Sequence, residues 1–234
     1  MHGFHTQQTR IAIDGVDDLV IRALADRQQF HDPRGHAQRL GISSAAWPLF
    51  GMCWPSGVAL ATRLAQRELR DGERILEIGC GLALPSLVGH RRGADVTASD
   101  CHPLAAGFLR ANLRLNGLAP MSYRHGQWNI PVRERVRSAV HRGSVVRGRF
   151  DLIIGSDLLY ERDASGGLAS FIGRHAKPRS QVWIVDPDRS NRAAFNRQMA
   201  LEGFRRSEER LDGLGYKGRL ITYERDQSPP TGRC

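Results

Sequence analysis

Short apolar runs alternate with amphipathic stretches through most of the 234-residue chain. The short runs predict buried strands, and stretches with apolar residues every three or four positions predict helices. Proline lies near the start of several of these helices and glycine follows their ends, which is the expected asymmetry. The predicted strands are 75–78, 95–99, 121–125, 150–155 and 181–186, and the predicted helices are 58–69, 85–91, 103–116, 164–176 and 191–202.

Strands that alternate with helices indicate an α/β fold, a doubly wound domain with a mostly parallel sheet. Two segments at 204–211 and 218–224 predict a β-hairpin that closes the domain. A second hairpin is predicted at the other end of the chain, where Asp14-Gly15 separates 10–13 from 16–24.

These patterns divide the chain into three parts. Residues 1–46 form an N-terminal extension, in which a polar loop or lid at 26–41 follows the hairpin. Residues 47–226 form the main domain, and 227–234 are expected to be a disordered tail.

The most informative segment runs from the strand at 75–78 into the following helix. Glu77 is followed by Gly79 and Gly81, and glycine lets a main chain approach a ligand closely. Asp100 ends the next strand, nineteen residues after Gly81, which is the spacing at which an acid meets ribose hydroxyls in nucleotide-binding folds. Together these features predict a cofactor that contains adenosine, and the alternative is an ordinary strand–helix turn with two glycines.

The segment also narrows the choice of cofactor. A dinucleotide fingerprint needs a third glycine where this chain has Leu84, and a phosphate-binding P-loop needs a Gly-Lys-Ser/Thr that is missing. Glu77 suits a cofactor with a free amino group better than one with a pyrophosphate. S-adenosylmethionine has that amino group and no phosphate.

The segment from Glu77 to Pro85 resembles the first motif of the seven-β-strand S-adenosylmethionine-dependent methyltransferases. The chain is most similar to the branch that contains the protein-lysine methyltransferases of the methyltransferase-16 type. The likeness runs from about Trp47 to Tyr223, and residues 1–40 and 131–149 do not share it. The further segments that carry it are Trp54–Ala61, Asn112–Gly117, Gln127-Trp128 and Phe150–Tyr160, the last with a D-x-x-Y signature at Asp157 and Tyr160.

The resemblance implies a Rossmann-like, seven-stranded sheet with an antiparallel last strand, and it implies cofactor-binding residues. Asp100 would hold the ribose, Trp128 would lie along the adenine and Trp54 would close over the cofactor. Cofactor contacts are also implied for Gly79, Cys80, Gly81 and Ser156. Both tryptophans have the alternative of core or rim packing, and Cys80 is better interpreted as a small turn residue than as a nucleophile.

The resemblance also suggests which residues act on the methyl acceptor. A lysine amine must lose its proton before it attacks, and its free pKa is about 10.4. We expect Asp157 to orient the ammonium or amine and Tyr160 to supply an aromatic wall. The alternative for this pair is a helix N-cap and a packed ring.

The net charge of +10 would ordinarily suggest an acidic or nucleic-acid partner. However, the chain has only two lysines, so the excess of arginine can reflect genomic base composition. The densest basic segment, 131–149, has no interleaved aromatic residues that could stack on bases. It is interpreted first as a solvated loop, then as a contact for an acidic protein, then as an RNA contact.

Other classes receive no support from the sequence. No apolar run is long enough to cross a membrane, and residues 1–10 lack the apolar stretch of a secretory signal. The four cysteines show no metal-binding spacing, so we predict no metal site and reduced thiols in a cytoplasmic protein.

The sequence therefore predicts a methyltransferase whose acceptor is a lysine side chain of a protein. Small-molecule or RNA methylation is the main alternative, because one fold serves all three. The D-L-L-Y exit of the fourth predicted strand differs from the Asn/Asp-Pro-Pro-Tyr expected for exocyclic amines of bases, and Asp186–Arg189 follows the next strand instead. A non-catalytic cofactor-binding module and, less favoured, a nicotinamide oxidoreductase are the remaining alternatives.

Overall fold

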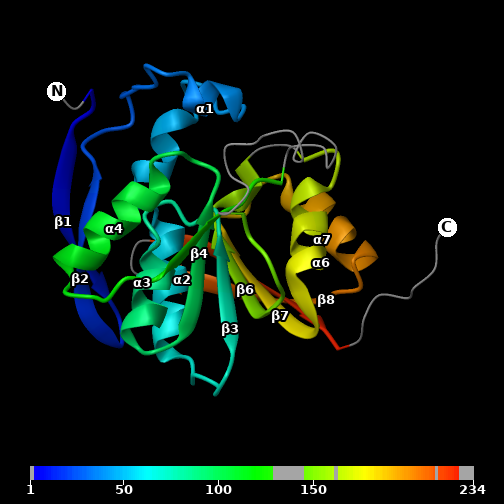
Figure 1. The fold of residues 1–234 in the computed structure, drawn as a ribbon. Coiled ribbons are helices and arrows are strands. Elements are labelled where there is room, and N and C mark those ends of the chain that lie inside the picture. The colour runs from blue at the N-terminus through cyan, green and yellow to red at the C-terminus, as the bar shows by residue number, and fades with distance from the viewer. Residues whose placement is uncertain (1–2, 129–144, 161–162, 214–215, 227–234) are drawn as a thin grey trace.

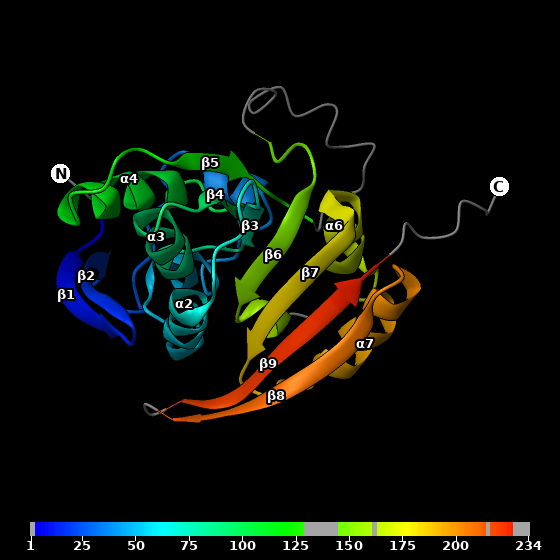
Figure 2. The same cartoon turned by 90° about the horizontal axis from the view of Figure 1, so that it is seen from below.

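A central β-sheet with helices on both faces forms the main domain in the computed structural model (Figures 1 and 2). The structure describes residues 3–128, 145–160, 163–213 and 216–226. The predicted tail 227–234 and most of the arginine-rich segment 131–149 lie outside these residues.

The seven-stranded sheet has the order β5-β4-β3-β6-β7-β9-β8. β3 pairs in parallel with β4 and β6, β7 pairs in parallel with β6, and β9 is antiparallel to both β7 and β8. The doubly wound fold and the antiparallel last strand are therefore confirmed. The strand bounds are β3 Arg74–Ile78, β4 Asp95–Asp100, β5 Ser122–His125, β6 Phe150–Ser156, β7 Ala176–Asp186, β8 Arg205–Gly213 and β9 Tyr216–Arg225.

Helices cover the sheet because its central strands are apolar on both sides. Ile75 of β3 belongs to a buried cluster with Leu60 and Leu64 of α2, whereas its neighbour Leu76 packs in a cluster with Phe171 and Phe195 of the opposite layer. Figure 2 shows α2, α3 and α4 on one face and α6 and α7 on the other. The helix bounds are α2 Pro55–Gln66, α3 Leu84–Arg91, α4 Ala105–Leu115, α6 Gly167–His175 and α7 Arg192–Leu201.

The predicted N-terminal hairpin is present as β1 (Thr6–Ile13) and β2 (Val16–Leu24), and it packs beside α4 (Figure 1). Asn112 of α4 and Asn116, the residue that follows this helix, bond to the open edge of β2. Asn112 Oδ1 accepts the N–H of Arg22 at 2.8 Å, and Asn116 Oδ1 accepts the N–H of Val20 at 2.9 Å. These side chains satisfy backbone groups that a neighbouring strand would otherwise satisfy.

The observed elements differ from the sequence prediction mainly at their ends. Helix α2 begins at Pro55, because proline fits the first turn of a helix. Strand β7 begins at Ala176 rather than 181, because Ala176 pairs with Phe150 of β6 before a shift in register, and the pairing with β6 resumes at Gln181. The predicted loop or lid contains one short helix, α1 (His36–Arg39), and a 3-10 helix, η1 (Trp47–Gly51), leads into the main domain. The domain boundary at residue 46 stays a prediction.

Candidate active site

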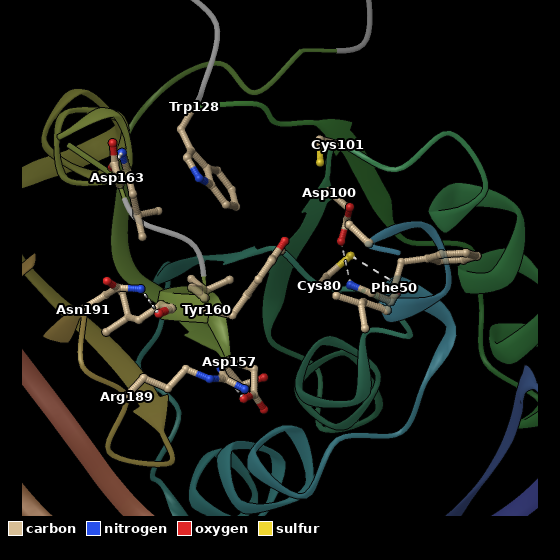
Figure 3. A pocket seen from close by; sticks show the side chains of 18 of the residues that line it. Phe50, Cys80, Asp100, Cys101, Trp128, Asp157, Tyr160, Asp163, Arg189 and Asn191 are labelled. Carbon is tan, nitrogen blue, oxygen red and sulfur yellow. Dashed lines mark hydrogen bonds and ion pairs between the residues drawn. The ribbon is translucent and has the colours of Figure 1, made fainter. Parts of the chain in front are cut away.

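A cavity of about 1620 Å³ opens at the carboxyl ends of the central parallel strands. This is where ligands bind in open α/β sheets. All ten site residues predicted from the sequence line it: Trp54, Glu77, Gly79, Cys80, Gly81, Asp100, Trp128, Ser156, Asp157 and Tyr160. In Figure 3, Cys80 and Asp100 lie on one side and Asp157 and Arg189 on the other, with Trp128 and Tyr160 projecting between them.

The glycine turn that leaves β3 has a backbone that other residues rarely adopt. Gly79 has φ +58° and Gly81 has φ +50°. A Cβ at Gly81 would lie 2.7 Å from the carbonyl oxygen of Phe50, and one at Gly79 would overlap the side chain of Leu158. The glycines therefore allow η1 and the segment after β6 to close on the turn, in addition to any approach to a ligand.

Asp100 links this turn to the end of β4. One of its oxygens accepts the N–H of Gly81 at 2.8 Å, and the other accepts the N–H of His102 at 2.7 Å. The side chain is buried, and this burial raises the pKa of the Asp100 carboxyl above its usual value, although these N–H donors oppose the shift. A carboxylate has about four acceptor positions, so Asp100 can also accept hydroxyl donors from a ligand.

Glu77 belongs to β3, and its buried carboxyl bonds to the first turn of α3. It accepts the N–H of Ser86 at 2.9 Å and also the Ser86 hydroxyl. Burial is the largest cause that raises the pKa of Glu77 to about 8, and the negative charge of Asp100 adds to it. A cationic group placed beside Glu77 would favour its ionised form.

Cys80 fits the interpretation as a turn residue. Its N–H donates to the carbonyl of Ser99 at 2.9 Å, and its side chain is buried. Burial, together with the charges of Asp100 and Glu77, raises the pKa of the Cys80 thiol well above its usual value. A thiol that stays protonated is a poor nucleophile.

Aromatic side chains form much of the wall. Trp54 donates its indole N–H to the carbonyl of Leu49 at 2.9 Å and precedes the first residue of α2. The ring of Trp128 meets that of Phe171 edge-on at 6.0 Å. Phe50 and His102, which also line the cavity, stack at 3.7 Å between ring centroids. Phe50 and His102 are buried against each other, so Trp128, which is only partly buried, is the ring with a face suited to a flat aromatic ligand.

The far end of the cavity is built from the segment after β6. Ser156 is the last residue of that strand, and Asp157 follows with φ +56° while its N–H donates to the carbonyl of Val185 at 3.0 Å. Burial raises the pKa of Asp157, and the nearby guanidinium of Arg189 opposes this shift. Tyr160 is half exposed at the rim.

Two residues of the segment after β7, Arg189 and Asn191, complete this end beside Asp186, the last residue of β7, and the sequence alone did not mark any of the three as a site residue. Arg189 Nη1 lies 2.6 Å from Asp157 Oδ1. Asp186 Oδ1 accepts the Arg189 N–H at 2.7 Å, and Asn191 Nδ2 donates to the carbonyl of Leu159 at 2.9 Å. The available signal was a polar run directly after a strand whose carboxyl end lies at the same edge of the sheet as that of β6.

Residues 49–199 match a family model described as lysine methyltransferase. The chain belongs to this family. The match covers the glycine turn, Asp100 and both members of the D-x-x-Y signature.

Individual relatives of the lysine methyltransferase family give a similar picture. The chain is 31% identical over 146 residues to the electron transfer flavoprotein beta subunit lysine methyltransferase of Danio rerio, with 61% of this chain and 51% of the relative covered. The chain thus spans about half the length of that relative. It is 28% identical over 147 residues to the human histone-arginine methyltransferase METTL23, with 58% and 70% covered.

Among solved structures, the magnesium protoporphyrin IX methyltransferase of Synechocystis with bound SAM shares the fold of this family member. The TM-score is 0.55 at 16% identity, and 73% of this chain and 78% of that one are covered.

Two features are absent from the part of the chain that the structure describes. It contains no group of three or more His, Cys, Asp or Glu residues arranged to hold a metal ion. It also contains no helix with the length and apolar character needed to cross a bilayer.

Proposed function

We propose that this protein transfers a methyl group from S-adenosylmethionine to a lysine side chain of a protein. The observation that carries the proposal is one cavity that joins the glycine turn and Asp100 at one end to Asp157 and Tyr160 at the other, in a chain of the lysine methyltransferase family. The roles of individual residues belong to this proposal.

The residues at the buried end fit S-adenosylmethionine. Asp100 has acceptor positions for ribose hydroxyls, and the face of Trp128 suits an adenine ring. Glu77 provides a carboxyl that a ligand ammonium would ionise, which matches the amino group of the methionine portion. In this assignment Trp54 closes the wall, while Gly79, Cys80, Gly81 and Ser156 border the cofactor.

The cofactor supplies a methyl group on a positively charged sulfur, which an amine can attack without any covalent enzyme intermediate. The protein must then hold the acceptor in line and exclude water. Asp157 would hold the ammonium or amine through its carboxylate, and the ring of Tyr160 would lie along the cationic side chain. A desolvated pocket also lowers the pKa of a lysine amine toward the neutral form that reacts.

Other methyl acceptors compete with a protein lysine in this proposal. Relatives include both a lysine and a histone-arginine methyltransferase, so an arginine acceptor is the nearest alternative. RNA or a small molecule would be acceptors of another class. A cytoplasmic location is part of the proposal and is supported by the free thiols of Cys53, Cys80 and Cys101.

The test is transfer of labelled methyl from S-adenosylmethionine into a host lysate, followed by separation of protein, RNA and small molecules. We expect label in protein, recovered as Nε-methyl-lysine after acid hydrolysis, and lost when Asp157→Asn replaces the wild type. Asparagine is a well-matched replacement, because it has the same shape and tolerates the left-handed backbone of residue 157.

Each other outcome contradicts a defined part of the proposal. Methyl-arginine in the hydrolysate would keep a protein acceptor but replace lysine, and label in RNA would replace the acceptor class. Binding of S-adenosylhomocysteine without transfer to any fraction would favour a non-catalytic module. Undetectable binding would remove the cofactor assignment from Glu77 to Asp100.

A further inference from the structure

The acceptor end of the cavity already holds a cation from this chain. Arg189 Nη1 lies 2.6 Å from Asp157 Oδ1, and both residues line the cavity. Figure 3 shows the Arg189 side chain extended toward Asp157 from the segment after β7. The carboxylate expected to meet an acceptor ammonium is therefore in contact with a guanidinium.

This contact is close but poorly directed. The side chain of Asp157 is 13% exposed and that of Arg189 is 29% exposed, so the pair is partly shielded from water. Nevertheless, the buried Nη1 of Arg189 makes no hydrogen bond of acceptable geometry with any described residue. A charged pair without a good hydrogen bond regains little of what its burial costs.

A second carboxylate lies beside the same arginine. Asp186 is fully buried, and its Oδ1 accepts the backbone N–H of Arg189. Its Oδ2 has no hydrogen-bond partner in the described part of the chain, and neither has the buried hydroxyl of Tyr216. Buried polar atoms are rarely left without a partner, so this arrangement lacks one donor or cation.

Charge makes the same point. Asp157 and Asp186 share the neighbourhood of Arg189: burial raises the pKa of both carboxyls, and the charge of Arg189 opposes this shift. An added ammonium at Asp157 would leave the guanidinium available to the open oxygen of Asp186. Each carboxylate would then have its own cation.

We propose that Arg189 is a displaceable counterion, which occupies the acceptor ammonium's place at Asp157 and turns to Asp186 Oδ2 when the acceptor enters. This inference rests on the proposed function and adds a positioning and specificity residue to it. With no acceptor present, Arg189 holds the carboxylate in place. A free amine has to compete with Arg189, so a simple alkylamine binds weakly, whereas a lysine held by further protein contacts can displace it.

The test measures binding of n-butylammonium, which carries the end of a lysine side chain, to the protein saturated with S-adenosylhomocysteine. Affinity is followed by NMR titration at constant ionic strength, so no turnover is needed. Arg189→Gln should bind n-butylammonium about tenfold more tightly than the wild type. The double variant Arg189→Gln/Asp157→Asn should lose that gain.

A matched control removes an arginine ion pair far from the cavity. Arg205, on the edge strand β8, pairs with Asp226 at 2.6 Å and both side chains are well exposed. Arg205→Gln should leave the affinity for n-butylammonium at the wild-type value. A gain in affinity is a readout that general loss of structure does not produce.

The proposal is overturned if Arg189→Gln binds n-butylammonium no better than the wild type while it still binds S-adenosylhomocysteine. It is equally overturned if the gain persists in the double variant. If Arg189→Gln does not fold, wild-type crystals soaked in n-butylammonium decide the matter. Arg189 turned to Asp186 supports the proposal, and Arg189 still on Asp157 contradicts it.

This result is separable from the result of the lysate assay. Tighter amine binding by Arg189→Gln without any methyl-lysine would leave the counterion role standing and remove the proposed acceptor. Methyl-lysine formation, with no change in amine binding by Arg189→Gln, would keep the proposed acceptor and remove the counterion role.

Discussion

The two ends of the cavity differ in how they are built. At the end proposed to hold the cofactor, Glu77 and Asp100 are buried and each bonds to the backbone of a neighbouring turn or helix. At the acceptor end, Tyr160 is half exposed and Asp157 pairs with a side chain from another loop. Backbone hydrogen bonds fix groups in place, whereas a side-chain ion pair can exchange partners. The first end is thus suited to one constant ligand, and the second to an acceptor that enters and leaves.

The largest expected effect comes from breaking the cofactor end at Gly81. Gly81→Ala combines a left-handed backbone with a Cβ 2.7 Å from the Phe50 carbonyl oxygen. We expect a loss of about 3 kcal/mol in the free energy of unfolding and at least a hundredfold loss of affinity for S-adenosylhomocysteine. Thermal melts and calorimetry measure the two quantities.

Gly93→Ala separates the cost of a left-handed backbone from the cost of steric overlap at the added Cβ. Gly93 has φ +88°, but a Cβ there would meet nothing within 4 Å. This variant should lose only about 1 kcal/mol and keep its affinity for S-adenosylhomocysteine. Equal losses of stability and affinity in Gly81→Ala and Gly93→Ala would mean that overlap with the Phe50 carbonyl adds nothing to the effect of the left-handed backbone.

Glu77→Gln should sharpen the comparison by improving stability while it weakens binding. The pKa of Glu77 is raised to about 8 in the folded protein, from 4.5, so the stability that the neutral carboxyl gives is present at low pH and lost as pH rises toward 8. Glutamine stays neutral, so the variant should exceed the wild type by about 4 kcal/mol at pH 8 and match it below pH 4.

Binding of S-adenosylhomocysteine to Glu77→Gln should move in the opposite direction. Its amino group is expected to favour the ionised carboxylate, so wild-type affinity should increase as pH rises toward 8. The variant should bind about tenfold more weakly and lose most of this pH dependence. Unchanged affinity at pH 8 would place the amino group elsewhere.

Substitution of Tyr160 should affect methyl transfer to the acceptor without affecting cofactor binding. Tyr160→Ala should lower kcat/KM for the protein acceptor about tenfold, because an aromatic face beside a partly desolvated cation contributes roughly 1.4 kcal/mol. Tyr160→Phe keeps that face and should lose less. Affinity for S-adenosylhomocysteine should stay within about twofold in both, and a large drop would assign Tyr160 to the cofactor.

The smallest expected effect is at Asn191, which donates to the carbonyl of Leu159 within the D-x-x-Y segment. Asn191→Ala removes one hydrogen bond worth about 1 kcal/mol, so kcat/KM should fall about fivefold. The binding of S-adenosylhomocysteine should not change. If transfer is also unchanged, the segment after β7 does not position the acceptor end.

The cofactor end could be predicted from the sequence because its signals are local. Gly79, Gly81 and Asp100 lie in a strand–turn–helix pattern and at the end of the next strand. Even there, the sequence did not reveal that the carbonyl of Phe50 and the side chain of Leu158 occupy the space of the missing Cβ atoms. That depends on how η1 and the segment after β6 fold back.

The acceptor end could be predicted only in part. Asp157 and Tyr160 came from a family signature, whereas Arg189 joins them through packing of two loops that follow different strands. Nothing in the order of residues pairs an aspartate after β6 with an arginine after β7. The strand pairing of β6 with β7 creates that proximity.

The most direct test of a divided cavity compares Asp100→Asn with Asp157→Asn, in binding of S-adenosylhomocysteine and in methyl transfer to the protein fraction. We predict that Asp100→Asn lowers both by at least tenfold. Asp157→Asn should keep binding within about threefold and lower transfer by at least a hundredfold. Binding lost equally in both variants, or transfer retained by Asp157→Asn, would contradict the account.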